Sequence, residues 1–186
     1  IQEAQSDLAI IKSLDILVKT RTMLVTHARG LVKSLGQRIP ACSAATFHNR
    51  LREEMPKELY PALEPIMKII EDLTTRIRHY DKRIEELGTE KYPETKRLRE
   101  ISGVGPLTSL AYVLTLEESS RFEKSRDVGA FLGLVHKRDK SGQVDKQLGI
   151  TKAGDVHLRR LLVGCAQYIL GAFGPDCELR RFGLKL

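Results

Sequence analysis

An apolar stripe that repeats at steps of three and four over residues 58–87 constrains the fold most strongly. The stripe consists of Leu59, Leu63, Ile66, Ile70, Leu73, Ile77, Tyr80, Ile84 and Leu87. This spacing places apolar side chains along one face of a helix, and its length is typical of a coiled coil or an antiparallel helical hairpin. Because glycine commonly follows a helix, we expect this one to end at Gly88.

A second long helix is predicted for residues 1–36, where apolar residues recur at steps of three, four or seven before Gly36 and Pro40. Residues 40–56 are expected to be a connector with one short helix after Ser43 or Thr46. The two long helices most simply pair antiparallel in a first domain, residues 1–90. Their polar faces mix both charges, so we interpret this domain as a structural arm or dimerisation device without chemistry. The long helices predict self-association into a dimer or tetramer.

The second domain, residues 91–186, is expected to be a compact helical unit, because glycine is more frequent there and the helical patterns are shorter. Helices are predicted near residues 94–101, 106–116, 125–132 and 155–171. Between Leu134 and Ile150, short apolar positions surround the polar sequence RDKSG, which indicates a β-hairpin or an extended loop. The predicted fold is mostly α-helical: a long antiparallel helical hairpin, then a compact helical domain with a helix-hairpin-helix motif and a short β-hairpin.

The positive charge of the chain is concentrated in one segment. The formal net charge is +7, and residues 121–160 hold ten Lys or Arg against five Asp or Glu. Such a segment favours a polyanionic partner, most commonly nucleic acid, although a solubilising surface explains the charge alone equally well. Aromatic residues make up only 5% of the chain, which argues against a platform that stacks single-stranded bases.

The cysteine pattern fits a reducing cytoplasm. Cys42, Cys165 and Cys177 are odd in number and far apart, without the spacing of a zinc site. The sequence shows no signal peptide or transmembrane run. Acidic residues are scattered, so we expect no metal site in this chain. The chain begins at Ile1 inside a helical pattern, so we expect it to be a fragment of a longer protein.

The sequence LREISGVGPLTSLAYVL, residues 98–114, is a candidate helix-hairpin-helix motif. Gly103 and Gly105 permit a tight turn and a close approach to a ligand. Val104 is expected to fill the gap between the helices, and Pro106 opens the second helix. The free N–H groups at the start of that helix can hold a phosphate of a DNA duplex. The alternative is a tight turn between two packed helices.

The sequence HKRDKSGQVDKQLGITKAG, residues 136–154, is a basic stretch with a Ser-Gly bend at its tip. Its candidate DNA-binding residues are Lys137, Arg138, Lys140, Gly142, Lys146 and Lys152. A serine beside cations can attack a phosphodiester, because cations lower the pKa of the hydroxyl and stabilise the developing charge. By residue type alone, however, Ser141 is more typical of a turn than of a nucleophile.

In the sequence ITKAGDVHLRRLLVGCAQYIL, residues 150–170, Thr151 or Asp155 can cap the start of a helix. Arg159 and Arg160 follow one turn later and suit bidentate phosphate binding. The alternative is a capped amphipathic helix with an exposed basic edge. We expect these cations, the Ser-Gly bend and the amides of the glycine turn to converge on one polyanion-binding surface.

Three sequences, ISGVGPLTSLAYVLTL, SRFEKSRDVGAFLGLVHKRDKSG and ITKAGDVHLRRLLVGCAQYIL, in this order and spacing resemble the C-terminal transposase domain of DEDD-type insertion-sequence transposases. Members of this family are bridge-RNA-guided recombinases. The resemblance covers residues 94–186 densely, and the preceding helices resemble the coiled-coil linker of the family. It implies DNA and a guide RNA as partners, a homo-oligomer, and a place beside the nucleoid in the bacterial cytoplasm without membrane attachment.

The resemblance also implies where the chemistry lies. Full-length members carry an N-terminal RuvC-like domain with four acidic metal-binding residues, and Mg²⁺ is expected there. This chain lacks that domain and is expected to hold no cofactor. The C-terminal domain of the family supplies a serine in a Ser-Gly context, which corresponds to Ser141 and Gly142. That serine attacks a DNA phosphodiester, and the acidic site of another subunit completes a composite active site.

We therefore predict a C-terminal transposase fragment that binds DNA, supplies Ser141 for strand exchange in the full-length protein, and is inactive in cleavage alone. Two features depart from the family: Thr151 stands where serine is common, and members continue beyond Leu186 with another basic helical segment. The alternatives are a non-catalytic nucleic-acid-binding module and a purely structural dimerisation arm.

Overall fold

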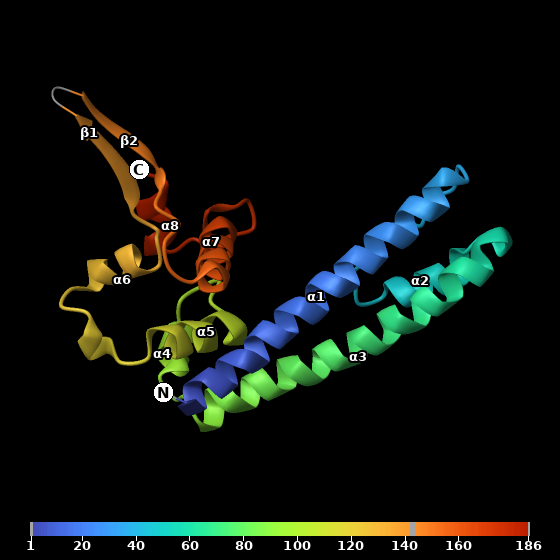
Figure 1. The fold of residues 1–186 in the computed structure, drawn as a ribbon, viewed down its shortest axis with the longest axis horizontal. Coiled ribbons are helices and arrows are strands. Elements are labelled where there is room, and N and C mark those ends of the chain that lie inside the picture. Colours follow the sequence, from blue (N-terminus) through green and yellow to red (C-terminus); the bar gives the residue numbers. More distant parts are fainter. Residues whose placement is uncertain (1, 142–143, 186) are drawn as a thin grey trace. The chain divides into compact units, whose positions relative to one another are not determined.

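The computed structural model describes residues 2–141 and 144–185, and the chain divides into two compact units, Ala9–Ile84 and Ile1–Leu8 with Glu85–Leu186 (Figure 1). The elements in chain order are α1 (Gln2–Ser34), α2 (Phe47–Glu54), η1 (Lys57–Leu59), α3 (Tyr60–Glu90), α4 (Thr95–Arg99), α5 (Pro106–Leu116), η2 (Ser119–Arg121), α6 (Ser125–Phe131), β1 (His136–Ser141), β2 (Val144–Ile150), α7 (Val156–Leu170) and α8 (Glu178–Gly183). The predicted mostly helical fold with a short antiparallel β-hairpin is confirmed. Within the described ranges, no helix has both the length and the apolar content that crossing a bilayer requires.

The Ala9–Ile84 unit consists of α1 and α3, which run side by side in opposite directions, with α2 against them (Figure 1). Side chains from all three helices and the connector form one core, which contains Ala28, Val32, Ile39, Phe47, Leu51, Leu63, Met67 and Ile70. Farther along the pair, Arg21 donates a hydrogen bond to Thr74 Oγ1 at 3.3 Å. The two long helices and the short connector helix therefore form where the apolar spacing predicts them, while a coiled-coil supercoil stays a prediction.

The end of α3 differs from the sequence prediction. The expected stop at Gly88 is wrong, because the helix continues to Glu90. The Thr95 hydroxyl donates hydrogen bonds to the carbonyl oxygens of Gly88 at 2.7 Å and Tyr92 at 2.8 Å. A Cβ atom at Gly88 would meet Thr95 Oγ1 at 3.4 Å, so glycine allows the next segment to pack closely. Close packing, rather than a helix end, explains this glycine.

Lys91 ties the first turns of α1 to the segment after α3. Its Nζ lies 2.6 Å from Asp7 Oδ2 and 2.7 Å from Glu3 Oε1. The Tyr92 hydroxyl also donates a hydrogen bond to Asp7 Oδ2, at 2.7 Å. Burial and this hydrogen bond raise the pKa of Tyr92, which keeps the phenol a proton donor to Asp7. The cluster fixes the start of α1 within the same unit as the α4–α8 region.

The centre of this second unit is the contact between α5 and α7, and α4 and α8 add to it on either side. Its buried apolar residues include Leu110, Ala111, Leu114, Leu132, Leu158 and Ile169. The sequence does not predict α8, because its six residues are too short for a periodic signal. Arg180 anchors it by donating hydrogen bonds to the carbonyl oxygens of Ile169 at 2.5 Å and Gly171 at 2.6 Å.

Candidate nucleic-acid interface

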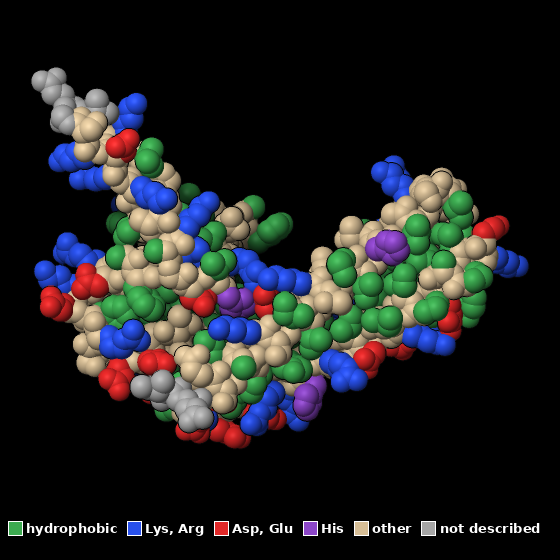
Figure 2. All heavy atoms as spheres, viewed as in Figure 1, with side chains coloured by type: hydrophobic (Ala, Val, Ile, Leu, Met, Phe, Trp, Pro, Cys, Tyr) green, Lys and Arg blue, Asp and Glu red, His purple; other side chains and the backbone are tan. Residues whose placement is uncertain are grey.

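The basic stretch folds into a hairpin that projects from the helices of its unit (Figure 1). The paired residues include Arg138 with Gln147, Asp139 with Lys146, Lys140 with Asp145, and Ser141 with Val144. Every residue of β1 is exposed, and so are residues 145–149. Figure 2 shows Lys and Arg side chains along the hairpin. The candidate residues Lys137, Arg138, Lys140, Ser141 and Lys146 therefore face solvent, while Gly142 lies outside the described residues.

The register divides the hairpin side chains between two faces, because successive residues of a strand point to opposite sides. One face carries Asp139, Ser141 and Lys146. The opposite face carries Arg138, Lys140, Asp145 and Gln147. On this opposite face, Lys140 Nζ lies 3.9 Å from Asp145 Oδ2. Cations thus stand on both faces, and a polyanion that contacts Ser141 meets a different set of charges from one that contacts Lys140.

Two glycines at the base of the hairpin allow two backbone segments to pack in direct contact. Gly133 has φ +67° and Gly154 has φ +72°, conformations that favour glycine. A Cβ atom at Gly133 would lie 2.3 Å from the Ala153 nitrogen, and one at Gly154 would lie 2.0 Å from the Phe131 oxygen. Neither position has room for a side chain, so the chain entering β1 and the chain leaving β2 are held together.

Backbone hydrogen bonds extend the pairing below the strands. The Thr151 N–H donates to the Val135 oxygen at 2.9 Å, and the Lys152 N–H donates to the Gly133 oxygen at 3.0 Å. Lys152 adopts φ +59°, which is uncommon for a residue with a side chain, and its side chain is exposed. The turn that closes the hairpin therefore places Lys152, one of the predicted cations, on the surface.

Arg159 is buried, so it does not lie on the exposed basic edge that the alternative interpretation of this helix contains, and its side chain is not displayed to a phosphate in solution. The residue is 8% exposed. One of its guanidinium nitrogens donates hydrogen bonds to the carbonyl oxygens of Leu132 at 2.8 Å and Ala153 at 2.5 Å. These carbonyls stand on the two chain segments at the hairpin base, so the guanidinium clamps the entering segment to the leaving one. In this structure the charge of Arg159 holds the hairpin.

The start of α7 is capped by Asp155, one of the two residues predicted for that role. Its Oδ1 accepts a hydrogen bond from the Leu158 N–H at 2.7 Å. Arg160, next to the buried Arg159, is exposed, and its guanidinium lies 2.9 Å from His157 Nδ1. Adjacent residues on a helix face different directions. Arg160 therefore lies on the surface of α7, while Arg159 points to the hairpin base.

The glycine turn between α4 and α5 packs against the other end of α7. Gly103 has φ +84°, and a Cβ there would lie 2.9 Å from Tyr168 Cδ1. Val104 is half-buried and donates its N–H to the Ile101 oxygen at 3.0 Å. Gly105 precedes α5, whose start receives no hydrogen bond from a capping side chain. Residues 99–105 and Tyr168 line an open depression of about 500 Å³ at this turn.

The structure does not bring the glycine turn and the hairpin together. The turn contacts α7 at Tyr168, while the hairpin base is held by Arg159. Nine residues separate these positions, which corresponds to about 13 Å along a helix. Strands β1 and β2 extend from the base away from the turn (Figure 1). The hairpin and the turn are therefore two separate candidate contacts for a polyanion, not one converging surface.

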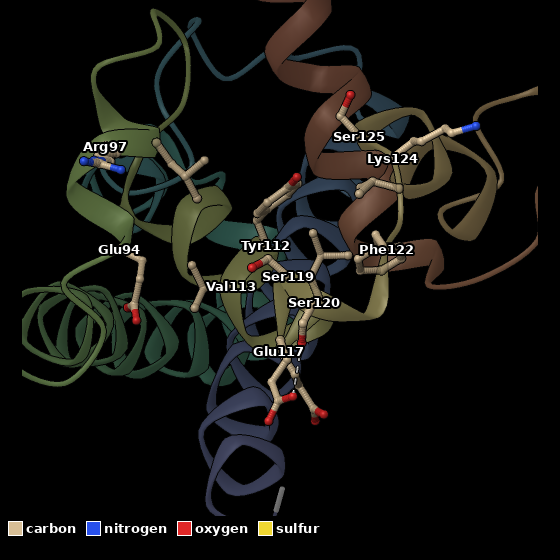
Figure 3. Close-up of a pocket in the computed structure, with 14 residues that line it drawn as sticks. Glu94, Arg97, Tyr112, Val113, Glu117, Ser119, Ser120, Phe122, Lys124 and Ser125 are labelled. Atoms are coloured by element: carbon tan, nitrogen blue, oxygen red, sulfur yellow. Dashed lines mark hydrogen bonds between the residues drawn. The ribbon is translucent and has the colours of Figure 1, made fainter.

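A cavity of about 730 Å³ lies among α4, α5, η2 and α6, and no sequence pattern indicates it because its lining comes from separate segments. Figure 3 shows Tyr112 and Phe122 in its lining, with Glu117 at one end and Lys124 at the other. Burial raises the pKa of Tyr112, so its phenol stays protonated. Glu117 has φ +57°, an uncommon conformation for a residue that is not glycine. Charges of both signs line this cavity.

Within residues 2–141 and 144–185, no group of three or more His, Cys, Asp or Glu side chains is arranged to bind a metal ion. The chemistry that these residues do offer consists of an exposed serine hydroxyl, exposed cations and backbone amides.

Comparison with known sequences relates part of the chain to a family of transposases. Residues 95–179, from the start of α4 to the beginning of α8, match the sequence model described as the Transposase IS116/IS110/IS902 family. This segment is therefore similar to a transposase domain of this family. The matched segment includes the glycine turn, the sequence of the hairpin and α7, so Arg159 and its hydrogen bonds to the hairpin base lie inside it.

The similar proteins are named as transposases, two of them for insertion sequence elements. The transposase for insertion sequence element IS1111A of Coxiella burnetii is 33% identical over 98% of this chain and 52% of its own length. The transposase for insertion sequence element IS1328 of Yersinia enterocolitica is 31% identical over 89% of this chain and 50% of its own length. A probable family 20 transposase of Pseudomonas aeruginosa is 26% identical over 88% of this chain and 50% of its own length.

The chain thus spans about half the length of the curated relatives that it matches. Their similarity extends over both units of the chain, because it covers most of its 186 residues. No solved structure matches the chain.

Replacing Arg159 by Met should lower the free energy of unfolding by about 2–4 kcal/mol, because the buried carbonyl oxygen of Leu132 and the partly buried one of Ala153 lose a charged donor. The amides of Thr151 and Lys152, which pair across the hairpin base, should exchange their hydrogens faster. Chemical denaturation and hydrogen exchange measure the two effects. The control is Arg160→Met, which removes the same charge from an exposed neighbour and should cost less than about 1 kcal/mol. Equal stability of the two variants would contradict the clamp.

Proposed function

We propose that this chain is the C-terminal part of an insertion-sequence transposase, which binds DNA with its hairpin and supplies Ser141 as the nucleophile of strand exchange. The observation that carries the proposal is the exposed Ser141 at the end of β1, on a strand pair whose cations face solvent. The family of residues 95–179 and the transposase relatives support the reaction class. The resemblance of the Ser-Gly sequence supports the choice of residue.

The shape and charge of the hairpin suit a DNA duplex. A two-stranded β-ribbon fits the width of the major groove, and Lys and Arg on its faces contact the phosphates that border the groove. The buried Arg159 and the two glycines at the base keep the ribbon in one orientation. A serine displayed at the end of such a ribbon reaches a phosphodiester without a further change in the fold.

The hydroxyl of Ser141 alone is a weak nucleophile, because it is neutral at physiological pH. Cations near the attacked phosphate stabilise the charge that develops on its oxygens, and they are present on both faces of the hairpin. We propose that Mg²⁺ acts in a RuvC-like domain elsewhere in the parent protein, so that the complete site is composite. The isolated chain is then expected to bind DNA without cleaving it.

The remaining partners follow from the same proposal. The antiparallel pair of α1 and α3 acts as a linker through which copies of the transposase assemble into a dimer or tetramer. A guide RNA selects the DNA ends, and the complex works at the nucleoid in the bacterial cytoplasm. The amides at the glycine turn before α5 form a second phosphate contact of the helix-hairpin-helix kind, separate from the hairpin.

Substitution of Ser141 by Ala in the complete transposase should abolish recombination while leaving DNA affinity within about twofold of the wild type, because one neutral hydroxyl adds little to binding. Recombination between two plasmids and a gel-shift titration measure the two quantities. Ser119→Ala, at an exposed serine outside the hairpin, should keep full recombination. If Ser141→Ala recombines normally, the chain is a non-catalytic binding module.

Binding of duplex DNA by this chain should weaken steeply with salt, because Lys and Arg release counterions from the phosphates they contact. Replacing Arg138 and Lys140 by Gln should reduce the slope of log affinity against log salt by about 2, one for each phosphate that is no longer neutralised. Fluorescence anisotropy at several salt concentrations measures the slope. The control pair is Lys12→Gln with Lys33→Gln, exposed cations on α1, and an equal reduction there would exclude the hairpin as the interface.

A further inference from the structure

The two faces of the hairpin are chemically different around Ser141. Asp139 precedes Ser141 by two residues and shares its face, and Lys146 stands opposite Asp139 on β2. Lys140 is the nearest cation along the chain, but the alternation of a strand points it to the other face. Lys140 is therefore closer to Ser141 along the chain, but Lys146 is better placed to contact a phosphate at Ser141.

Lys146 is the cation within reach of the reacting position. Diagonal neighbours across an antiparallel pair stand about 7–8 Å apart, a distance that a long side chain covers. Lys137 also alternates toward this face, but a register irregularity separates it from the regular pairs and it lies four residues from Ser141, about 13 Å along the strand. Of the lysines in the described part of the hairpin, Lys146 is the one placed beside the serine.

The electrostatic surroundings strengthen this assignment. Within the described residues, Lys146 forms no ion pair, whereas Lys140 lies 3.9 Å from the carboxylate of Asp145. A phosphate at Ser141 would be repelled by Asp139 on the same face, and the ammonium of Lys146 directly across from Asp139 offsets that repulsion. The ammonium of Lys146 is therefore available to bind an oxygen of a phosphate at Ser141.

Resting on the proposed function, we propose that Lys146 is a catalytic residue that binds a non-bridging oxygen of the attacked phosphate. In this step Ser141 Oγ forms a bond to phosphorus, and the bond from phosphorus to the 3′ oxygen of the DNA strand breaks. The Oγ proton passes to water, and the departing 3′ oxygen takes a proton from water. The ammonium of Lys146 stabilises the added negative charge of the five-coordinate phosphorus, which a ground-state contact by Lys140 does not.

The test compares two single-charge substitutions on opposite faces, Lys146→Gln and Lys140→Gln, in the complete transposase. The rate of covalent protein–DNA formation is measured in a single turnover with saturating DNA, and the dissociation constant is measured separately. Lys146→Gln should slow the covalent step by about 100-fold or more, the usual effect of losing one transition-state donor. Lys140→Gln should act mainly on the dissociation constant. Lys146→Arg, which keeps the charge, should recover at least a tenth of the rate, and Lys12→Gln should change neither quantity.

Equal slowing of the covalent step by Lys146→Gln and Lys140→Gln would overturn the assignment, as would a Lys146→Gln variant that loses affinity alone. Circular dichroism and the exchange rates of the Thr151 and Lys152 amides show whether each variant keeps the hairpin, and Lys146→Arg tests the charge without shortening the side chain. If Ser141→Ala still forms the covalent product, the proposed function fails as well. If Ser141→Ala abolishes it while the two lysine variants behave alike, only the role of Lys146 fails.

Discussion

The hydrogen bonds from buried Arg159 to the carbonyl oxygens of Leu132 and Ala153 are the interaction on which the hairpin depends. An isolated two-stranded hairpin is marginally stable in water, and this one has an exposed β1 with no apolar face to bury. Its order must therefore come from its base. There Gly133 and Gly154 bring two backbones together, and the guanidinium satisfies the carbonyls that this contact leaves without strand partners.

This arrangement explains why a basic residue is buried in a domain whose surface is basic. A charge is costly to bury unless it is hydrogen-bonded, and Arg159 recovers that cost through oxygens at 2.8 and 2.5 Å. The result links α7, part of the packed core, to an exposed ribbon that has no core of its own. The strands can then carry mostly polar residues, because the packing at the base, rather than a core between the strands, holds them in place.

The sequence predicts the helices and strands whose residues follow a local pattern. It does not predict contacts between residues that lie far apart along the chain. The apolar stripe of α3, the start of α5 at Pro106 and the hairpin around RDKSG all follow from local spacing or turn chemistry. Gly88 misleads because a glycine that makes room for Thr95 looks, in sequence, like one that ends a helix. Arg159 misleads because helical spacing cannot show a partner such as Leu132, 27 positions earlier. The separation of the glycine turn from the hairpin follows only from the packing of both on α7.

Under the proposed function, Ser141 is the residue that becomes covalently bound to DNA. The most direct test is to trap the complete transposase on a DNA substrate whose cleavage cannot be reversed, digest the adduct, and locate the modified residue by tandem mass spectrometry. The account predicts a nucleotide attached through phosphate to Ser141. A nucleotide on any other residue, or DNA cleaved without a covalent adduct, would contradict it.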